Sequence, residues 1–174
     1  MRIFAALALP DEPRAALQAE IRRLKKLHEE DGRWSRTENL HLTLAFMGEA
    51  DASAARRAAA AVAELPSIEL AWTFSKLGAF GRAGILWAGL AEEKRICALS
   101  EDVRRRFDDI GQSYDKKPFQ AHITLARDWR GPRPDALSSS LPKLRFEALP
   151  AKAQVFVSER EVSGRIRYRV LRSV

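Results

Sequence analysis

Apolar side chains along this chain recur in two spacings, one typical of strands and one typical of helices. Over residues 68–75 they alternate with more polar side chains, which is the period of a strand with one buried face. Over residues 17–27 leucine and isoleucine recur every three or four positions, with basic residues between them, which predicts an amphipathic helix. Both kinds of element are therefore expected, and the fold class is α+β.

The same two patterns assign the rest of the chain. Strands are predicted at residues 3–9, 39–46, 68–75, 85–90, 119–127, 153–159 and 165–171, the last two forming a hairpin around Ser163 and Gly164. Helices are predicted at residues 11–27, with Asp11 as the cap, at residues 51–65, and across residues 96–110. Glycines make residues 78–84 a turn-rich connection, and residues 131–142 form a Pro- and Ser-rich loop with room for one short helix.

One strand–helix–strand pattern occurs twice. It covers residues 3–46 and again residues 85–127, and the step from His41 to His122 is a displacement of 81 positions. Such a duplication predicts two similar lobes related by an approximate twofold axis. No linker divides them, so we expect residues 1–174 to form a single two-lobed domain with outer helices and a central cleft.

The two copies share a five-residue word. It reads His41-Leu42-Thr43-Leu44-Ala45 in the first copy and His122-Ile123-Thr124-Leu125-Ala126 in the second. Because side chains alternate along a strand, the His and Thr of each word share one face, and the apolar residues up to Phe46 share the other. The apolar face is expected to pack on helices, which leaves two His–Thr pairs facing the cleft.

Two opposed histidines suit a displacement at phosphorus. The entering and leaving oxygens lie on opposite sides of the phosphorus, so a base is needed on one side and an acid on the other. Histidine's ordinary pKa of about 6.5 allows one ring to be neutral and the other charged near neutral pH. Threonine hydroxyls can donate hydrogen bonds to phosphate oxygens. The pattern predicts His41 and His122 as catalytic residues and Thr43 and Thr124 as substrate-binding residues.

The charge and the cysteine content of the chain indicate what kind of partner it binds and in which compartment it lies. Lys and Arg number 30 against 23 Asp and Glu, and the formal charge of +7 suits a polyanion such as RNA. The single cysteine, Cys97, excludes an internal disulfide and a thiolate metal cluster, and no acidic cluster with ligand spacing lies near either word. No metal, no cofactor and no membrane span are expected, and we predict a cytoplasmic monomer.

The two His-x-Thr-x words resemble those of the 2H phosphoesterases, and among them the bacterial and archaeal RNA 2′,3′-cyclic phosphodiesterases once called 2′-5′ RNA ligases. The resemblance extends over most of the chain. It is carried by residues 2–7, Trp34, residues 38–44, residues 86–89 and residues 118–127.

This resemblance implies a bilobal fold of antiparallel sheets around a cleft, and hydrolysis of a terminal RNA 2′,3′-cyclic phosphate to a 2′-phosphomonoester. It implies that His41 is the proton donor and His122 the proton acceptor. It also implies that Arg127 binds the substrate phosphate or base. Strict alternation places Arg127 on the face opposite His122, so a twist or bulge is needed for that contact.

Other functions are compatible with the same residues. The same histidines would serve an RNA 2′-5′ ligase or a phosphodiesterase for a small cyclic nucleotide, and a non-catalytic RNA-binding module is a third alternative. Phe4, Trp34 and Phe119 are expected in the core or the cleft wall, with base stacking as the alternative, and His28 on the surface. The alternating arginines of residues 165–169 either guide RNA toward the cleft or protect an edge strand.

Overall fold

The computed structural model describes residues 1–171 and contains one large sheet, one small sheet and three α-helices. The strands are β1 (Arg2–Ala8), β2 (Arg33–Trp34), β3 (His41–Glu49), β4 (Ile68–Ala71), β5 (Phe74–Phe80), β6 (Ile85–Leu90), β7 (Ile123–Arg127), β8 (Ala148–Ala151), β9 (Gln154–Arg160) and β10 (Ile166–Val170). The helices are α1 (Asp11–Leu27), α2 (Ala52–Ala63) and α3 (Glu93–Asp109). None of the helices in this part of the chain is long and apolar enough to cross a membrane.

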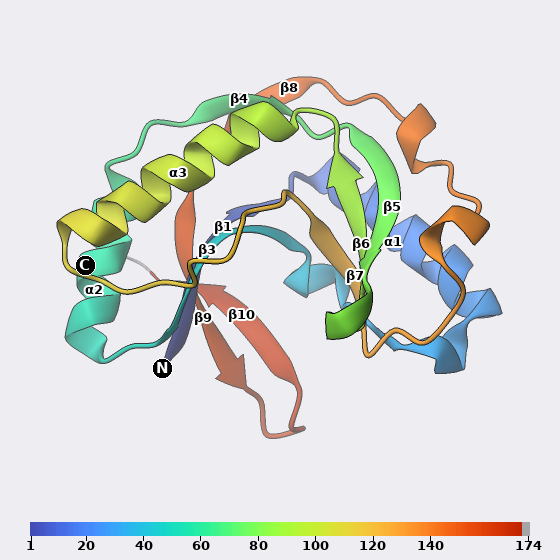
Figure 1. The fold of residues 1–174 in the computed structure, drawn as a ribbon, viewed down its shortest axis with the longest axis horizontal. Coiled ribbons are helices and arrows are strands. Elements are labelled where there is room, and N and C mark those ends of the chain that lie inside the picture. Colours follow the sequence, from blue (N-terminus) through green and yellow to red (C-terminus); the bar gives the residue numbers. More distant parts are fainter. Residues whose placement is uncertain (172–174) are drawn as a thin grey trace.

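Strand order makes the duplication visible. The large sheet runs β10-β9-β1-β3-β7-β6-β5, with β2 paired to β7, and β4 pairs with β8 in the small sheet (Figure 1). All of these pairings are antiparallel. The order β1-β3 on one side of the centre mirrors β6-β7 on the other, so the twofold axis passes between β3 and β7. The predicted α+β fold with two related lobes is confirmed.

The duplication extends further than the sequence pattern indicates. The pair β4 and β5 starts at Ile68 and Phe74, and the pair β8 and β9 starts 80 positions later, at Ala148 and Gln154. Strand β5 of the first half joins β6 of the second, and β9 of the second half joins β1 of the first. Each half therefore completes the sheet of the other, which ties the two lobes together.

Two elements differ from the sequence prediction in the region of residues 68–84. The single strand predicted at residues 68–75 is broken between β4 and β5, because Trp72 is buried and the Thr73 N–H turns back to the Ala71 carbonyl at 2.7 Å. Strand β5 then continues to Phe80, through residues predicted as a turn. Position 78 of this strand is a glycine because a Cβ there would come within 2.2 Å of the Trp87 ring. Close packing, and not a turn, therefore explains the glycine.

Helix starts and strand starts also differ in detail. Asp51 caps α2 as predicted, accepting the Ala54 N–H at 2.7 Å, but Asp11 is the first residue of α1 and Pro10 is its cap. The strand predicted at residues 119–127 begins only at Ile123. The loop at residues 131–142 holds one 3₁₀ turn, Pro134–Ala136, and the start of a second, Leu141–Lys143, where one short helix was expected.

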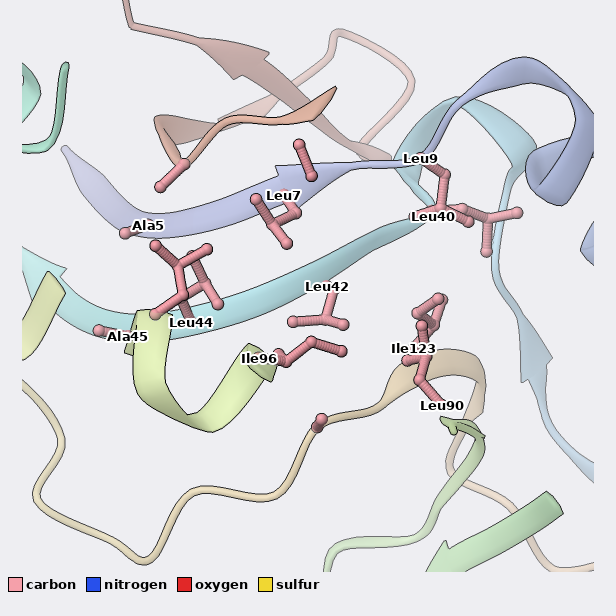
Figure 2. Close-up of a cluster of buried hydrophobic side chains, with 14 of the residues drawn as sticks. Ala5, Leu7, Leu9, Leu40, Leu42, Leu44, Ala45, Leu90, Ile96 and Ile123 are labelled. Carbon is pink, nitrogen blue, oxygen red and sulfur yellow. The ribbon is translucent and has the colours of Figure 1, made fainter. Parts of the chain in front are cut away.

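The convex face of the sheet forms the core. Leu42 and Ile123, which are opposite each other on β3 and β7, are fully buried, and Ile96 of α3 packs beside them (Figure 2). The Ser100 hydroxyl of α3 donates to the Leu44 carbonyl at 2.6 Å. The helix therefore fixes β3 from behind, and the opposite face of the strand is left to the cleft.

Candidate active site

The two His–Thr pairs lie on the concave face where β3 meets β7. Because Leu42 is opposite Ile123 in an antiparallel pair, His41 is the neighbour of Thr124, and Thr43 is the neighbour of His122. The two histidines are thus diagonal to each other across the strand pair. The structure brings together the four residues that the repeated words single out.

A β-bulge in each repeat turns one further side chain into the cleft. On β3, Ala45 and Thr43 are partners of consecutive β1 residues, so Leu44 is the extra residue; on β7, Leu125 is extra in the same way against β6. A bulge of this kind shifts the alternation by one residue. It supplies the shift that Arg127 required, and Arg127 lines the same cavity as His41.

The matching residue of the first repeat is Phe46, and its expected place in the core is wrong. It is half-buried on the concave face, where its ring centroid is 6.5 Å from that of Phe4. The Arg2 guanidinium lies 5.0 Å from the Phe46 ring centroid. The two bulges therefore place different side chains at equivalent positions of the cleft, an aromatic ring in the first repeat and a guanidinium in the second.

Each histidine is held by the backbone two residues before it. Nδ1 of His41 lies 2.7 Å from the Asn39 carbonyl oxygen, and Nδ1 of His122 lies 2.8 Å from that of Gln120. A carbonyl accepts only, so Nδ1 carries the proton in both rings and Nε2 is left for the cleft. Nε2 of His41 is 3.0 Å from Oγ1 of Thr43, whose hydroxyl donates to it when the ring is neutral.

Burial and positive charge lower the pKa of both rings. Burial is the largest effect on His41; the bond to Asn39 opposes it, the charges of Arg127 and His122 add to it, and the pKa falls to about 4. The pKa of His122 is also lowered, first by burial and further by Arg127, while its bond to Gln120 raises it. Both imidazoles are neutral at pH 7 before an anion binds, because burial and, to a lesser extent, the Arg127 charge disfavour protonation.

Aromatic rings surround both histidines. The His41 ring is 4.8 Å from Phe4 and 4.9 Å from Tyr168 between centroids, and the His122 ring is 4.9 Å from Phe80. These rings limit the orientation of each imidazole and exclude water from its faces, which accounts for the burial effect on the pKa.

Two adjoining cavities open onto the site. The larger, of about 620 Å³, is lined by His41, Thr124 and Arg127 together with Trp34 and Tyr168. The smaller, of about 150 Å³, is lined by Thr43 and His122 together with Phe46 and Phe119. Trp34 and Phe119 are thus cleft-wall residues, whereas Phe4 lies beneath His41 and is nearly fully buried.

Some residues around the site carried no clear sequence signal. Asn39 and Gln120 precede the two histidines by the same interval, which is the one sign of their shared role. Tyr168 lies beside His41, on the face of β10 opposite to that of Arg167 and Arg169. His28, expected on the surface, is mostly buried at the end of α1 and pairs with Asp31 at 2.8 Å. Among residues 1–171, no three His, Cys, Asp or Glu side chains form a group that could hold a metal ion.

Comparisons with known proteins agree with this architecture. A family model described as "LigT like Phosphoesterase" matches residues 7–87 and 89–168. The chain is 35% identical over 133 residues to an RNA 2′,3′-cyclic phosphodiesterase of Geobacillus stearothermophilus, a match that spans 71% of this chain but 39% of that protein. It is 30% identical to the enzyme of that name from Escherichia coli K12, over 73% of this chain and 72% of the relative.

Solved structures show the same likeness. The structure of E. coli LigT complexed with 3′-AMP is similar over 98% of this chain and 95% of that one, with a TM-score of 0.78 and 27% identity. TT0787 of Thermus thermophilus is similar over 99% and 96%, with a TM-score of 0.72 and 26% identity.

Proposed function

Since this chain belongs to the LigT-like phosphoesterase family, we propose that it is an RNA 2′,3′-cyclic phosphodiesterase that forms a 2′-phosphomonoester. The single observation that carries the proposal is the diagonal arrangement of His41 and His122 on adjacent strands, with Arg127 beside them. Relatives from several bacteria and two archaea that carry this name support the reaction class.

In the proposed reaction, water attacks phosphorus as the bond from phosphorus to the ribose 3′ oxygen breaks. Nε2 of His122 accepts the proton of the attacking water, and Nε2 of His41 donates a proton to the leaving 3′ oxygen. The 2′ ester bond remains, so the product carries a 2′-phosphate and a free 3′ hydroxyl. Exchange of one proton with solvent at each ring restores the starting state. The resemblance to the 2H phosphoesterases supports this division of roles, and the Nδ1 bonds support Nε2 as the reacting atom of each ring.

The proposed acid must be charged, although the free protein holds His41 neutral at pH 7. The cyclic phosphate carries one negative charge, and its arrival beside the rings opposes the burial and Arg127 effects that lower their pKa values. Substrate binding therefore recruits the proton that the reaction uses. Only one of the two rings can be charged in the productive complex, because the other must accept a proton from water.

Phosphate binding is assigned to Arg127 and to the hydroxyls of Thr43 and Thr124. The guanidinium offers donors in a fork that matches two phosphate oxygens, and each threonine adjoins the histidine of the other repeat across the strand pair. These three donors would stabilise the charge that develops on the non-bridging oxygens. The proposed mechanism uses no metal and no cofactor, because the two imidazoles supply the proton transfers and Arg127 supplies the positive charge.

The experiment is hydrolysis of an oligoribonucleotide with a 2′,3′-cyclic end in excess EDTA, with the product identified by ³¹P NMR. We expect conversion to the 2′-phosphomonoester, without ligation when a 5′-hydroxyl RNA is added. Loss of turnover in EDTA that one divalent ion restores would contradict metal independence. A 3′-phosphate product or a joined 2′-5′ product would contradict the proposed reaction.

A further inference from the structure

Positive charge is concentrated on one side of the site. The larger cavity is lined by six basic side chains: Lys25, Arg33, Arg36, Arg127, Arg160 and Arg165. None of the carboxylates in residues 1–171 lines it. Its volume of about 620 Å³ is well within the range that holds whole ligands rather than a single phosphate group.

The six basic residues differ in whether a carboxylate already neutralises them. Arg33 pairs with Asp128, Lys25 lies 3.9 Å from Glu29, and Arg36 lies 3.1 Å from Glu161. Within residues 1–171, the guanidinium groups of Arg127, Arg160 and Arg165 form no ion pair with a carboxylate. Arg127 is assigned to the reacting phosphate, which leaves two unneutralised arginines for a further anionic group.

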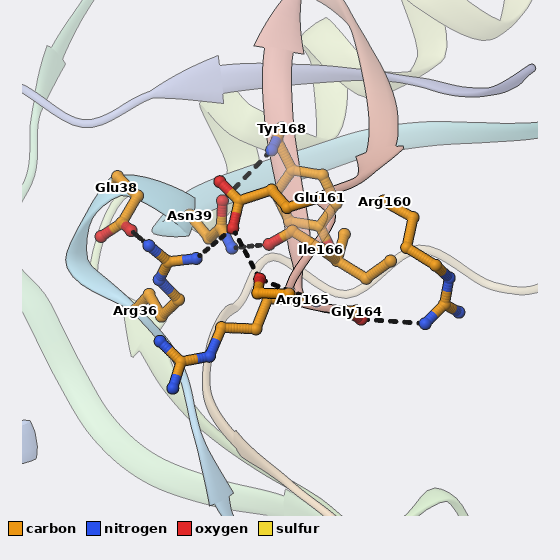
Figure 3. A network of polar contacts seen from close by, with 10 residues as sticks. Arg36, Glu38, Asn39, Arg160, Glu161, Gly164, Arg165, Ile166 and Tyr168 are labelled. Carbon is orange, nitrogen blue, oxygen red and sulfur yellow. Dashed lines mark hydrogen bonds and ion pairs between the residues drawn. The ribbon is translucent and has the colours of Figure 1, made fainter.

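Both of these arginines belong to the end of the β9–β10 hairpin. Arg160 is opposite Ile166 in the strand pair and shares the concave face with Phe156 and Tyr168, and Arg165 lies in the turn. Arg160 donates to the Gly164 carbonyl at 2.9 Å, which holds its side chain across the turn (Figure 3). The hairpin end therefore presents two cations to the cavity, beyond the histidines and Arg127.

The remaining hairpin arginines face the other way. Arg167 is opposite Glu159 on the outer face of the strand pair, and Arg169 bonds to Glu159 at 2.6 Å. The arginines of residues 165–169 therefore do not all have the same surroundings. Arg167 and Arg169 lie on the outer face of the hairpin, whereas Arg165, with Arg160, lines the cavity at the site.

Residues just before His41 hold the β9–β10 hairpin in place. The Asn39 amide donates to the Ile166 carbonyl at 2.8 Å and accepts the Tyr168 N–H at 3.2 Å. Arg36 bonds to Glu161 at 3.1 Å (Figure 3). The hairpin is therefore joined to the segment that carries His41, and its cations keep a set position relative to the reacting group.

We propose that the cavity between the β9–β10 turn and residues 33–36 binds backbone phosphates of the RNA strand upstream of the reacting end, through Arg160 and Arg165. The proposal rests on the proposed function and names its substrate class as an oligonucleotide in preference to a mononucleotide. Regularly spaced phosphates suit the unpaired cations, and Trp34 and Tyr168 in the same wall suit unpaired bases, which stack on aromatic rings.

The test compares kcat/KM for a short oligoribonucleotide with a 2′,3′-cyclic end and for cytidine 2′,3′-cyclic phosphate, as a function of salt. The oligonucleotide should be favoured at low salt, and the preference should diminish as salt rises. Arg165→Ala should lower the ratio of the two kcat/KM values on the order of fivefold, and should reduce the log–log salt slope by roughly 0.7. Arg160→Ala should act in the same direction.

Arg167→Ala is the matched control, because it removes the same charge from the outer face of the same hairpin. It should leave the ratio and the salt slope at the wild-type values. The Arg165 side chain has no hydrogen bond within the turn to lose, so Arg165→Ala tests the proposal even if Arg160→Ala disturbs the hairpin.

Three results have distinct meanings. Equal kcat/KM for both substrates in the wild-type protein, or equal effects of Arg165→Ala and Arg167→Ala, would overturn the upstream binding site. Hydrolysis of neither substrate would overturn the proposed function itself. Hydrolysis of both with a salt-dependent preference lost only in the cavity-facing variants is the expected result.

Discussion

His41 and His122 occupy matching positions in the two repeats, and each is oriented by a backbone carbonyl two residues earlier. Their identity as a pair could be predicted from the repeated word, since strand alternation puts each His and Thr on one face. The side chains around them could not. Phe4, Tyr168 and Phe80 reach the rings from distant parts of the chain, and the bulges that place Phe46 and Arg127 in the cleft leave no sequence signature.

Replacement of either cleft histidine should remove nearly all turnover. We expect His41→Ala and His122→Ala each to lose at least about a hundredfold in kcat, because each removes one proton transfer. His28→Ala, at the end of α1 and outside the cleft, is the matched control and should retain activity. Steady-state kinetics and thermal unfolding together check this prediction. Substantial turnover by a well-folded His41 or His122 variant would contradict the two-histidine mechanism.

Replacement of Arg127 should raise the pKa values of both histidines. The Arg127 charge disfavours the protonated rings, so Arg127→Met removes part of the cause that lowers each pKa. NMR titration of the imidazole protons in the free protein measures this directly. Arg33→Met, on the adjacent strand β2 and already paired with Asp128, is the control and should produce a smaller rise. Unchanged histidine titration in Arg127→Met would contradict the electrostatic account of the site.

At the scale of elements, most strands and helices follow from hydrophobic periodicity, and the exceptions at residues 119–122 and 148–151 do not. Residues 119–122 have the same alternation of apolar and polar side chains as β7. They nevertheless lie outside the strand, which starts at Ile123. Residues 148–151 are paired only because β8 meets the equivalent strand β4 of the other repeat. Such pairing between repeats depends on tertiary contacts and cannot be predicted from a local pattern.

The link between Asn39 and β10 should control the stability of the hairpin. Asn39→Ala removes two hydrogen bonds to the backbone of β10, and we expect a loss of roughly 1–2 kcal/mol in the free energy of unfolding. Amide exchange at Tyr168 should accelerate, because its N–H loses its acceptor. The Glu161 N–H, which bonds to the Arg165 carbonyl at the turn, is an internal reference and should exchange at its former rate. Unchanged exchange at Tyr168 would show that Asn39 does not hold the strand.

At the scale of the whole molecule, duplication explains both the symmetry of the site and its asymmetry. The twofold axis between β3 and β7 places two equivalent His–Thr pairs diagonally, which an in-line reaction requires. The last hairpin breaks the symmetry, because β10 extends the sheet beyond β9 with no counterpart beyond β5 in the part of the chain that the structure describes. The repeated word made the two lobes predictable, whereas the exchange of β5 and β9 between the halves became visible only in the strand order.

The central claim, that two coupled histidines exchange protons with the substrate, is tested most directly by the pH dependence of kcat/KM and kcat. Burial and the Arg127 charge lower both pKa values in the free protein, that of His41 to about 4. The profile of kcat/KM, which reports the free protein, should therefore be bell-shaped, with its alkaline limb below the ordinary histidine pKa of about 6.5. Bound phosphate favours the charged ring, so the kcat profile should lie at higher pH. Profiles that stay flat from about pH 5 to 9, with the chemical step shown to be rate-limiting, would contradict histidine acid–base catalysis.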